Sequence, residues 1–547
     1  MRSTLFLAAV AAIALPSSVR AADPPIVFQV QPLGRVLADA RATVKLVAGD
    51  EAVKQFNKSL QRSFGEKGFD GLDLSRPIVG YVIVPENLLD SVAVVALPVT
   101  GEKDFLDLCE RANGSKPTAI AGGLYELPAL DPKVKAVCKV VNQYAYIATG
   151  QNPNGALAPA NIVAAQTLFD PTEASLATAK IHFDRFAPGT QDKVVAMLLE
   201  LKKTAMGKGL GAQETIIVDP LLKLAMQVLE QSKDAKLAVV RLALDSRTGD
   251  FSAEASVTAK PGTALEKTIT AWKPSTNKFA SLVTPDTAVG FKASLPLFNK
   301  DLRDGTATGL EELRKQIPAN GTPAAGAALD ELFKGLSRTV KAGDFDVAGA
   351  IRGPDKKGLF TVIGAIAFED ALPLEKAFRA FVDADSPPEF KKNLKWDAAK
   401  AGKVSIHTVK LSDNGGSWFA EITKPFGESP TIAFAFAPNG IFIAVGPDAV
   451  DAIKDALVVK ATPSPVVDIV INPARLGKFV ATISPEGQPM VEKMFGTENK
   501  PFSLMSLTVA GGKELKVRYA VNLKLLGSVP FGTNASGTFD KEEVEKK

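Results

Sequence analysis

Hydrophobic and polar residues alternate along this chain with two different periods, and together the periods predict an α+β fold. A period of two, typical of strands, marks residues 92–99 and 236–259. A period near 3.6, typical of amphipathic helices, marks residues 51–64 and 102–112. Successive strand patterns are joined by tight turns, for example near residues 246–250. We therefore expect mostly antiparallel sheets with helices packed on them.

A similar order of patterns returns in the second half of the chain. The elements predicted there are strands at residues 346–351, 360–368, 404–411, 431–436 and 441–445, helices at 374–382 and 449–457, and a hairpin at 502–526 that turns at Gly511-Gly512. This recurrence predicts an internal duplication, with one half at residues 25–273 and the other at residues 283–526. The strand at residues 92–99 should then correspond to residues 360–368. Phe28 and Phe291 should be core residues of related strands.

The two ends of the chain differ from the rest in composition. Residues 1–21 combine Arg2 with an apolar run at 5–15, which predicts a signal peptide cleaved after Ala21. That run is shorter than the roughly 20 apolar residues of a membrane span, and no cysteine stands at the cleavage site for lipid attachment. A retained anchor is the alternative. The mature chain is predicted to be periplasmic or secreted, without a transmembrane segment, and to end in a disordered tail at residues 531–547.

Composition and charge narrow the class of protein. Of the 547 residues, 46% are hydrophobic and 23% are charged, as in ordinary globular proteins. The formal charge is +4, and it becomes +2 when Arg2 and Arg20 leave with the signal peptide. Basic and acidic residues are interleaved rather than clustered. We therefore expect no nucleic-acid partner.

The chain has two cysteines, Cys109 and Cys138, and the sequence leaves two interpretations open. In an oxidising compartment they can form one disulfide, worth about 3–4 kcal/mol from the entropy of the closed loop. Alternatively, both are small buried hydrophobic residues. Two thiols without supporting histidines do not complete a four-ligand zinc site, so no metal site is predicted.

Candidate catalytic residues are scarce. His182 and His407, the two histidines, both fall in strand patterns, where a structural role is expected. A serine–lysine tetrad at residues 275–278 and a Ser-Asp-Asn tripeptide at 412–414 lie in turn-rich segments, and the glycine-rich residues 207–212 do not follow a strand. With 30 Phe but three Trp and five Tyr, the aromatic residues suit a core better than a sugar site. We predict no catalytic residues and no cofactor.

The chain resembles an uncharacterised family of secreted bacterial proteins with tandem α+β repeats of unknown function. The similarity rests on GLDLSRPIVGYVIV, LPVTGEKDFLDLC, YAYIATG and IFIAVG, and it extends over most of the mature chain. This resemblance implies no catalytic residues.

The resulting expectation is an exported, non-catalytic binding or structural protein of the cell envelope. Its partner would be an unknown protein or envelope component. The alternative is an extracytoplasmic hydrolase that uses dispersed carboxylates or a serine–lysine pair.

Overall fold

The structure is a computed structural model of the whole chain, and it divides into two compact units. The residues that it describes are 23–85, 90–128, 135–150, 152–187, 189–190, 193, 231–296, 300–317, 322–411, 423–458, 461–489 and 505–524. Unit 1 comprises the described residues up to Lys273 together with Thr508–Tyr519, and unit 2 comprises the others. The expected signal peptide and tail, the tripeptide at 412–414 and the glycine-rich residues 207–212 lie outside the described residues.

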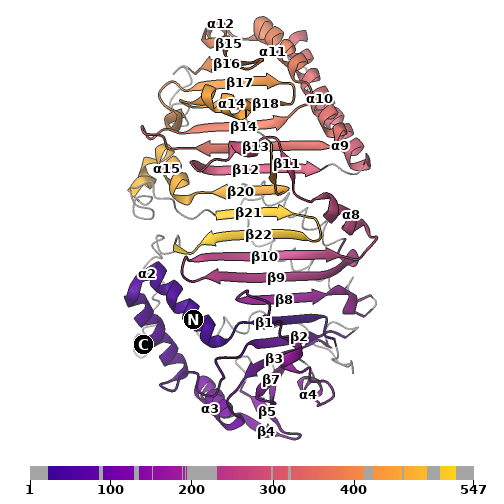
Figure 1. Cartoon of the computed structure of the whole chain (residues 1–547), viewed down its shortest axis with the longest axis vertical. Coiled ribbons are helices and arrows are strands. Elements are labelled where there is room, and N and C mark those ends of the chain that lie inside the picture. Colours follow the sequence, from indigo (N-terminus) through magenta and orange to yellow (C-terminus); the bar gives the residue numbers. More distant parts are fainter. Residues whose placement is uncertain are drawn as a thin grey trace, which may run out of the picture. The chain divides into compact units, whose positions relative to one another are not determined.

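Unit 1 is built on an antiparallel sheet (Figure 1). Its strands are β1 (Ile26–Val30), β2 (Ile78–Ile83), β3 (Val92–Pro98), β4 (Thr118–Ile120), β5 (Leu124–Leu127), β6 (Ala136–Val141), β7 (Tyr144–Thr149), β8 (Ala177–His182), β9 (Ala235–Asp245) and β10 (Asp250–Ala259). Pairing places them in the order β4-β5-β6-β7-β3-β2-β1-β8-β9-β10. The chain returns late to this unit, because β22 (Leu515–Asn522), which follows β21 (Met505–Ala510), pairs with β10.

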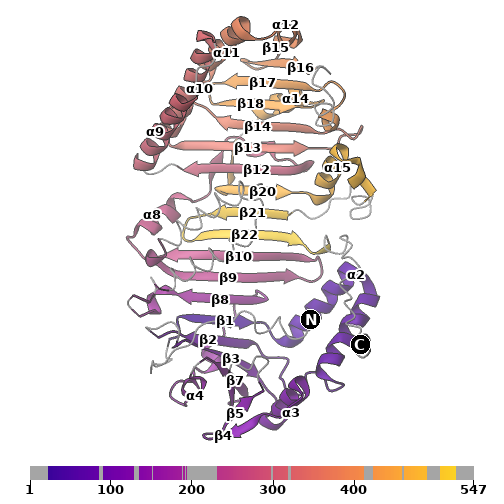
Figure 2. The ribbon, with the colours of Figure 1, turned by 180° about the vertical axis from the view of Figure 1, so that it is seen from behind.

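The helices of unit 1 are α2 (Leu33–Phe64), α3 (Glu102–Asn113), α4 (Pro153–Ala156), α5 (Ala165–Leu168), α8 (Ala264–Ala271) and the 3-10 turns η2 (Phe183–Arg185) and η3 (Gln231–Asp234). Of these, α3 packs on one face of the sheet around Cys138, and α4 and α5 pack on the other face around Tyr81 (Figure 2). Gly49 interrupts α2 with a φ of 83°, so that helix consists of two segments, the second of which includes the helix predicted at residues 51–64. The amide of Ala165 at the start of α5 donates to the Tyr146 hydroxyl (2.9 Å), which anchors that short helix to the core.

Unit 2 contains a second antiparallel sheet. Its strands are β12 (Thr287–Pro296), β13 (Asp344–Arg352), β14 (Thr361–Ala367), β15 (Leu394–Ala401), β16 (Val404–Lys410), β17 (Thr431–Ala437), β18 (Gly440–Val445) and β20 (Val467–Ile471), with a separate ribbon of β11 (Ser275–Asn277) and β19 (Thr462–Ser464). The order across the sheet is β15-β16-β17-β18-β14-β13-β12-β20.

Two groups of helices lie on opposite faces of the unit 2 sheet. The helices are α9 (Lys300–Gln316), α10 (Pro323–Ala342), α11 (Leu372–Asp385), α12 (Pro388–Asn393), α14 (Ala449–Val458) and α15 (Pro473–Ile483), with 3-10 turns η4 (Ala280–Leu282), η5 (Lys424–Phe426) and η6 (Pro485–Gly487). On one face α14 packs on alanine-rich strands around Ile363 and Phe442. On the other, α10 and α11 pack on Phe434, Phe436 and Ile441. Figure 1 shows α10 and α11 along one side of these strands.

The two units have the same connectivity. Reading β1 as β12, β2 as β13, β3 as β14, β4–β7 as β15–β18 and β8 as β20 converts one strand order into the other. Helices follow the same rule, with α3 after β3 and α11 after β14. The strand predicted at residues 92–99 therefore occupies the same place in its sheet as the strand predicted at 360–368.

The structure confirms the predicted α+β class and corrects several details. Strand β15 was not predicted, because Leu394–Ala401 is rich in alanine and lysine and forms a sheet edge. Residues 508–519 of the second hairpin belong to unit 1 rather than to the half expected from chain order. Among the described residues, no helix combines the length and the apolar composition needed to cross a bilayer.

Candidate functional site

One cross-strand row of residues provides a direct comparison of the two sheets. Side chains of directly paired residues point to the same face of an antiparallel sheet. In unit 1 the row from β1 to β6 is Phe28, Gly80, Val95, Ile147 and Cys138. In unit 2 the equivalent row from β12 to β17 is Phe291, Gly349, Gly364, Ile443 and Phe434.

Each row begins with an aromatic ring over a glycine. A Cβ built on Gly80 would lie 2.1 Å from Cζ of Phe28, and one built on Gly349 would lie 2.7 Å from Cε1 of Phe291. The absence of a side chain on the neighbouring strand therefore lets each ring lie across it. Both phenylalanines occupy related strands, as predicted. The predicted burial is wrong for Phe291, which is 43% exposed, and Phe28 is half-buried.

An apolar groove of about 460 Å³ lies on this face of unit 2. All fourteen residues that line it are Val, Ile, Ala, Gly or Phe. Its floor is the paired glycines Gly349 and Gly364, and a Cβ built on Gly364 would meet no atom closer than 3.8 Å. Phe291 and Ile443, 43% and 52% exposed, stand at its two ends. The groove is therefore an open depression with neither a charge nor a polar side chain.

The backbone around this groove has no free hydrogen-bonding edge. Strands β12, β13, β14 and β18 each pair with a strand on both sides. A ligand therefore cannot add as a further strand, and contact with the groove must come from apolar side chains or hydrocarbon. In unit 1 the position of Gly364 is occupied by Val95, whose side chain covers the corresponding backbone.

A charged cluster lies further along the same face of unit 2, beneath α11. Arg379 donates to Glu375 (2.7 Å from Nη2) and to Asp397 (3.1 Å), and its guanidinium stacks 4.3 Å from the centre of the Trp396 ring. His407 is fully buried beside them, and its Nε2 lies 3.3 Å from Oε1 of Glu375 without an aligned hydrogen bond. Ligand atoms of Glu375, Asp397 and His407 lie within 4.8 Å of one another, which is a spacing compatible with a metal ion.

The protonation pattern of this cluster argues against metal binding. Nδ1 of His407 accepts the backbone N–H of Asp397 (3.0 Å), so a neutral ring carries its proton on Nε2. Neither ring nitrogen then offers a lone pair, and Arg379 already engages both carboxylates. Burial lowers the pKa of His407, against the attraction of Glu375. Hydrogen bonds from Ser405 and then Arg379 lower the pKa of Asp397. The cluster is best explained as a closed ion-pair network that holds α11 on the sheet.

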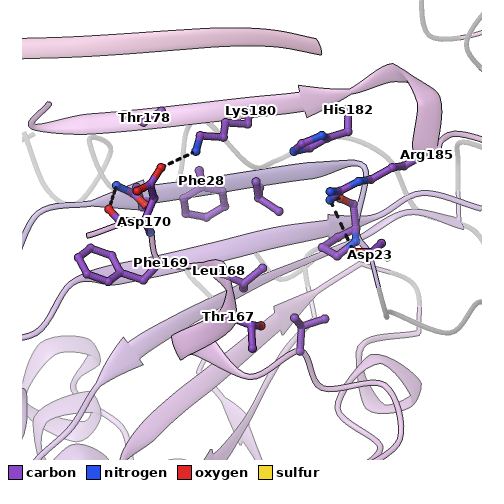
Figure 3. A pocket seen from close by; sticks show the side chains of 14 residues that line it. Asp23, Phe28, Thr167, Leu168, Phe169, Asp170, Thr178, Lys180, His182 and Arg185 are labelled. Atoms are coloured by element: carbon purple, nitrogen blue, oxygen red, sulfur yellow. Dashed lines mark hydrogen bonds and ion pairs between the residues drawn. The ribbon is translucent and has the colours of Figure 1, made fainter. Parts of the chain in front are cut away.

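A polar cleft of about 300 Å³ lies in unit 1 between β8 and α5 (Figure 3). Thr178, Lys180 and His182 alternate along β8, so they project from the same side of the strand. Arg185 follows in η2, and Asp170 faces Lys180 across the cleft (3.1 Å). Hydrogen bonds from Thr172 and then Lys180 lower the pKa of Asp170 to about 2, so it stays ionised. Sequence reasoning placed His182 on a strand correctly but missed this gathering of charged groups.

The two cysteines belong to one apolar cluster under α3. Cys109 and Cys138 are both buried and both carry free thiols in the structure. Burial raises the pKa of Cys109 to about 11 and that of Cys138 to about 12, the latter with a further contribution from Cys109. Such thiols are weak nucleophiles, because the thiolate is the reactive form. The disulfide remains a prediction for the oxidised protein.

The serine–lysine tetrad is not brought into a catalytic arrangement. Ser275 lies in strand β11 rather than at the start of a helix. Asn277 within the tetrad is fully buried and donates to Ser294 and to the carbonyl of Ala293, which is a structural role.

Comparison of the chain with family models, with characterised proteins and with solved structures gives no match. The resemblance to secreted proteins with tandem repeats therefore stays a prediction.

Proposed function

We propose that the mature protein is an exported, non-catalytic binding protein of the cell envelope that holds an apolar ligand in the groove of unit 2. The observation that carries this proposal is the groove itself. Large exposed apolar patches are uncommon on soluble surfaces and mark sites of interaction. Here such a surface is hollowed at Gly349 and Gly364 and walled by Val and Ile side chains.

The shape and chemistry of the groove favour a hydrocarbon chain as its occupant. Gly364 leaves bare backbone at the floor, next to the Phe291 ring that lies over Gly349. Glycine within a strand often marks a place where something approaches closely. No lining side chain can donate or accept a hydrogen bond, so a peptide backbone or a sugar laid there would lose its hydrogen bonds to water without replacement. Burial of hydrocarbon carries no such penalty.

The charged groups support catalysis less well than the groove supports binding. Arg379 forms ion pairs with both Glu375 and Asp397, and Asp170 pairs with Lys180. Among the described residues, His407 forms no hydrogen bond with a serine, threonine or cysteine that could act as a nucleophile. A hydrolase that uses dispersed carboxylates or a serine–lysine pair is the alternative that the experiment below must separate.

Export and duplication are supported by different observations. Export to the periplasm or beyond rests on the sequence of residues 1–21 alone. Duplication is supported by the common strand order of the two units and by the two Phe–Gly pairs at equivalent positions. A repeated scaffold suits binding, because one copy can be altered without loss of the fold.

The test is to incubate mature protein with a cell-envelope lipid extract, recover the protein by gel filtration, and analyse both fractions by mass spectrometry. We expect an apolar molecule to be retained unchanged by the wild type and by Gly309→Val, which alters an exposed glycine of α9 with open space around it. Gly364→Val should retain much less, because the side chain fills the groove. Reproducible chemical conversion of the extract, abolished by replacing an Asp, Glu, Ser or Lys, would support the hydrolase instead.

A further inference from the structure

The polar cleft of unit 1 contains more hydrogen-bond donors than the protein uses. Arg185 has five N–H donors, yet among the described residues it donates one hydrogen bond, from Nη1 to the Pro24 carbonyl (3.3 Å). Its nearest carboxylate, on Asp23, is 3.9 Å away, and that side chain is 78% exposed. Lys180 uses one of its three donors on Asp170. Figure 3 shows Lys180, His182 and Arg185 in succession along one side of the cleft.

The oxygens of Asp170, by contrast, already accept hydrogen bonds. Asp170 Oδ1 accepts from the backbone and the hydroxyl of Thr172, and Oδ2 accepts from Lys180. The backbone of Asp170 is paired with the side chain of Gln29, which accepts from the N–H (2.9 Å) and donates to the carbonyl (3.3 Å). Asp170 is therefore fixed by its neighbours, whereas Lys180 and Arg185 have unused donors.

A second, independent observation concerns Thr178, which lines the same cleft. Thr178 is 3% exposed, and its hydroxyl has no hydrogen-bond partner among the described residues. A buried hydroxyl without a partner is unfavourable, so a polar molecule in the cleft that accepted or donated a hydrogen bond there would relieve this penalty.

We propose that this cleft is a second binding site, separate from the apolar groove, and that it binds the oxyanion group of a small ligand, a carboxylate or a phosphate. Such a group accepts several hydrogen bonds, which matches the unused donors of Lys180, His182 and Arg185. The planar fork of Arg185 suits two oxygens of one such group. The apolar side chains of Leu168 and Phe169 at the opposite wall would contact the rest of the ligand.

His182 makes the binding depend on pH. Burial and then Arg185 lower its pKa; Lys180 acts in the same direction, and Asp184 and Asp23 oppose them. An oxyanion beside the ring favours the charged form, so binding raises the pKa of His182. By linkage, affinity then increases as pH falls from 7.5 toward 5.5.

Proton NMR of the imidazoles gives a direct test, because the chain has two histidines and His182→Gln identifies the signal of His182. Inorganic phosphate, and separately acetate, should raise the apparent pKa of His182 in the mature wild-type protein. Arg185→Gln should weaken this response by about tenfold to a hundredfold, the usual value of a charge-assisted hydrogen bond. Arg247→Gln, an exposed arginine of the same unit outside the cleft, should respond as the wild type does.

Vesicles distinguish the source of the oxyanion. If phosphatidylglycerol vesicles shift the His182 signal while phosphatidylcholine vesicles and free anions do not, the ligand is a lipid headgroup. If phosphate or acetate acts in solution, the ligand is a free small molecule. The proposal is overturned if none of these probes changes the titration of His182, or if Arg185→Gln and Arg247→Gln respond alike.

Discussion

Units 1 and 2 carry the same strand order but differ in what their equivalent rows present to solvent. In unit 1 the residue next to Gly80 is Val95, and in unit 2 the residue next to Gly349 is Gly364. A single side chain therefore separates a covered sheet face from an open groove. The comparison shows how a groove can arise on one of two sheets that share the same strand order.

The two rows also differ where they continue toward the sheet edge, on strands β5 and β16. In unit 1 the Tyr125 hydroxyl donates to Glu102 of α3 (2.5 Å), and in unit 2 His407 faces Glu375 of α11 (3.3 Å). Tyr125 and His407 are equivalent by register, each one strand beyond Cys138 or Phe434. Both units thus attach a helix to the sheet through a carboxylate, but the partner of that carboxylate titrates in a different pH range.

The largest expected difference between the units concerns the glycines beneath the phenylalanine rings. Gly80→Ala should lower the free energy of unfolding by about 3 kcal/mol, because its Cβ would meet both the Phe28 ring and the carbonyl oxygen of Val94 at 2.7 Å. Gly349→Ala should cost about 1 kcal/mol or less, because the exposed Phe291 ring can move aside. Urea unfolding measures both values, and equal losses would contradict the difference in ring burial drawn between the two rows.

At Gly364, in the groove floor, we expect a smaller change in the free energy of unfolding, and of opposite sign. Gly364→Val should raise the free energy of unfolding by about 0.5–1 kcal/mol, because valine suits a strand and the space for its side chain is open. Thermal and urea unfolding report the change, with Gly309→Val as a variant outside the sheet. Marked destabilisation by Gly364→Val would mean that the groove is already filled in the folded protein.

The smallest expected effects are those of pH, and they differ in direction between the units. Because burial lowers the pKa of His407, the unfolded chain takes up this proton first, and stability is lost as pH falls below about 6.5. The hydrogen bond to Glu102 raises the pKa of Tyr125, so its contribution is present below pH 10 and is lost above it. His407→Gln should reduce the acid dependence, and Tyr125→Phe the alkaline dependence. Unfolding curves at pH 5.5, 7.5 and 10.5 that are unchanged by these variants would refute the assignments.

Local patterns in the sequence predicted much of the fold. The turns at residues 246–250 and at Gly511-Gly512 join β9 to β10 and β21 to β22 as expected, because turn-forming residues there separate clear alternation. The two histidines lie on strands β8 and β16. Each of these features is determined by residues adjacent in the sequence, so a local pattern is enough to predict it.

The sites were harder to predict because they depend on pairing between distant strands. Burial of Phe291 was expected from its apolar character, yet the ring is 43% exposed. The sequence of its own strand does not indicate that the ring is left uncovered. The polar cleft needs the pairing of β1 with β8, which brings Gln29 to Thr178 and positions Asp170. Two signals could have been used: the glycines within the Val- and Ile-rich strands at 349 and 364, and the polar alternation of Thr178, Lys180 and His182.

The central claim is that Gly364 opens a binding groove in unit 2, and a fluorescence titration with the neutral apolar probe N-phenyl-1-naphthylamine tests it most directly. The probe carries no charge, so the polar cleft of unit 1 should not attract it. Wild type and Gly309→Val are predicted to bind one probe per chain with the same affinity, and Gly364→Val to bind at least tenfold more weakly. Equal binding by Gly364→Val and the wild type would contradict the claim.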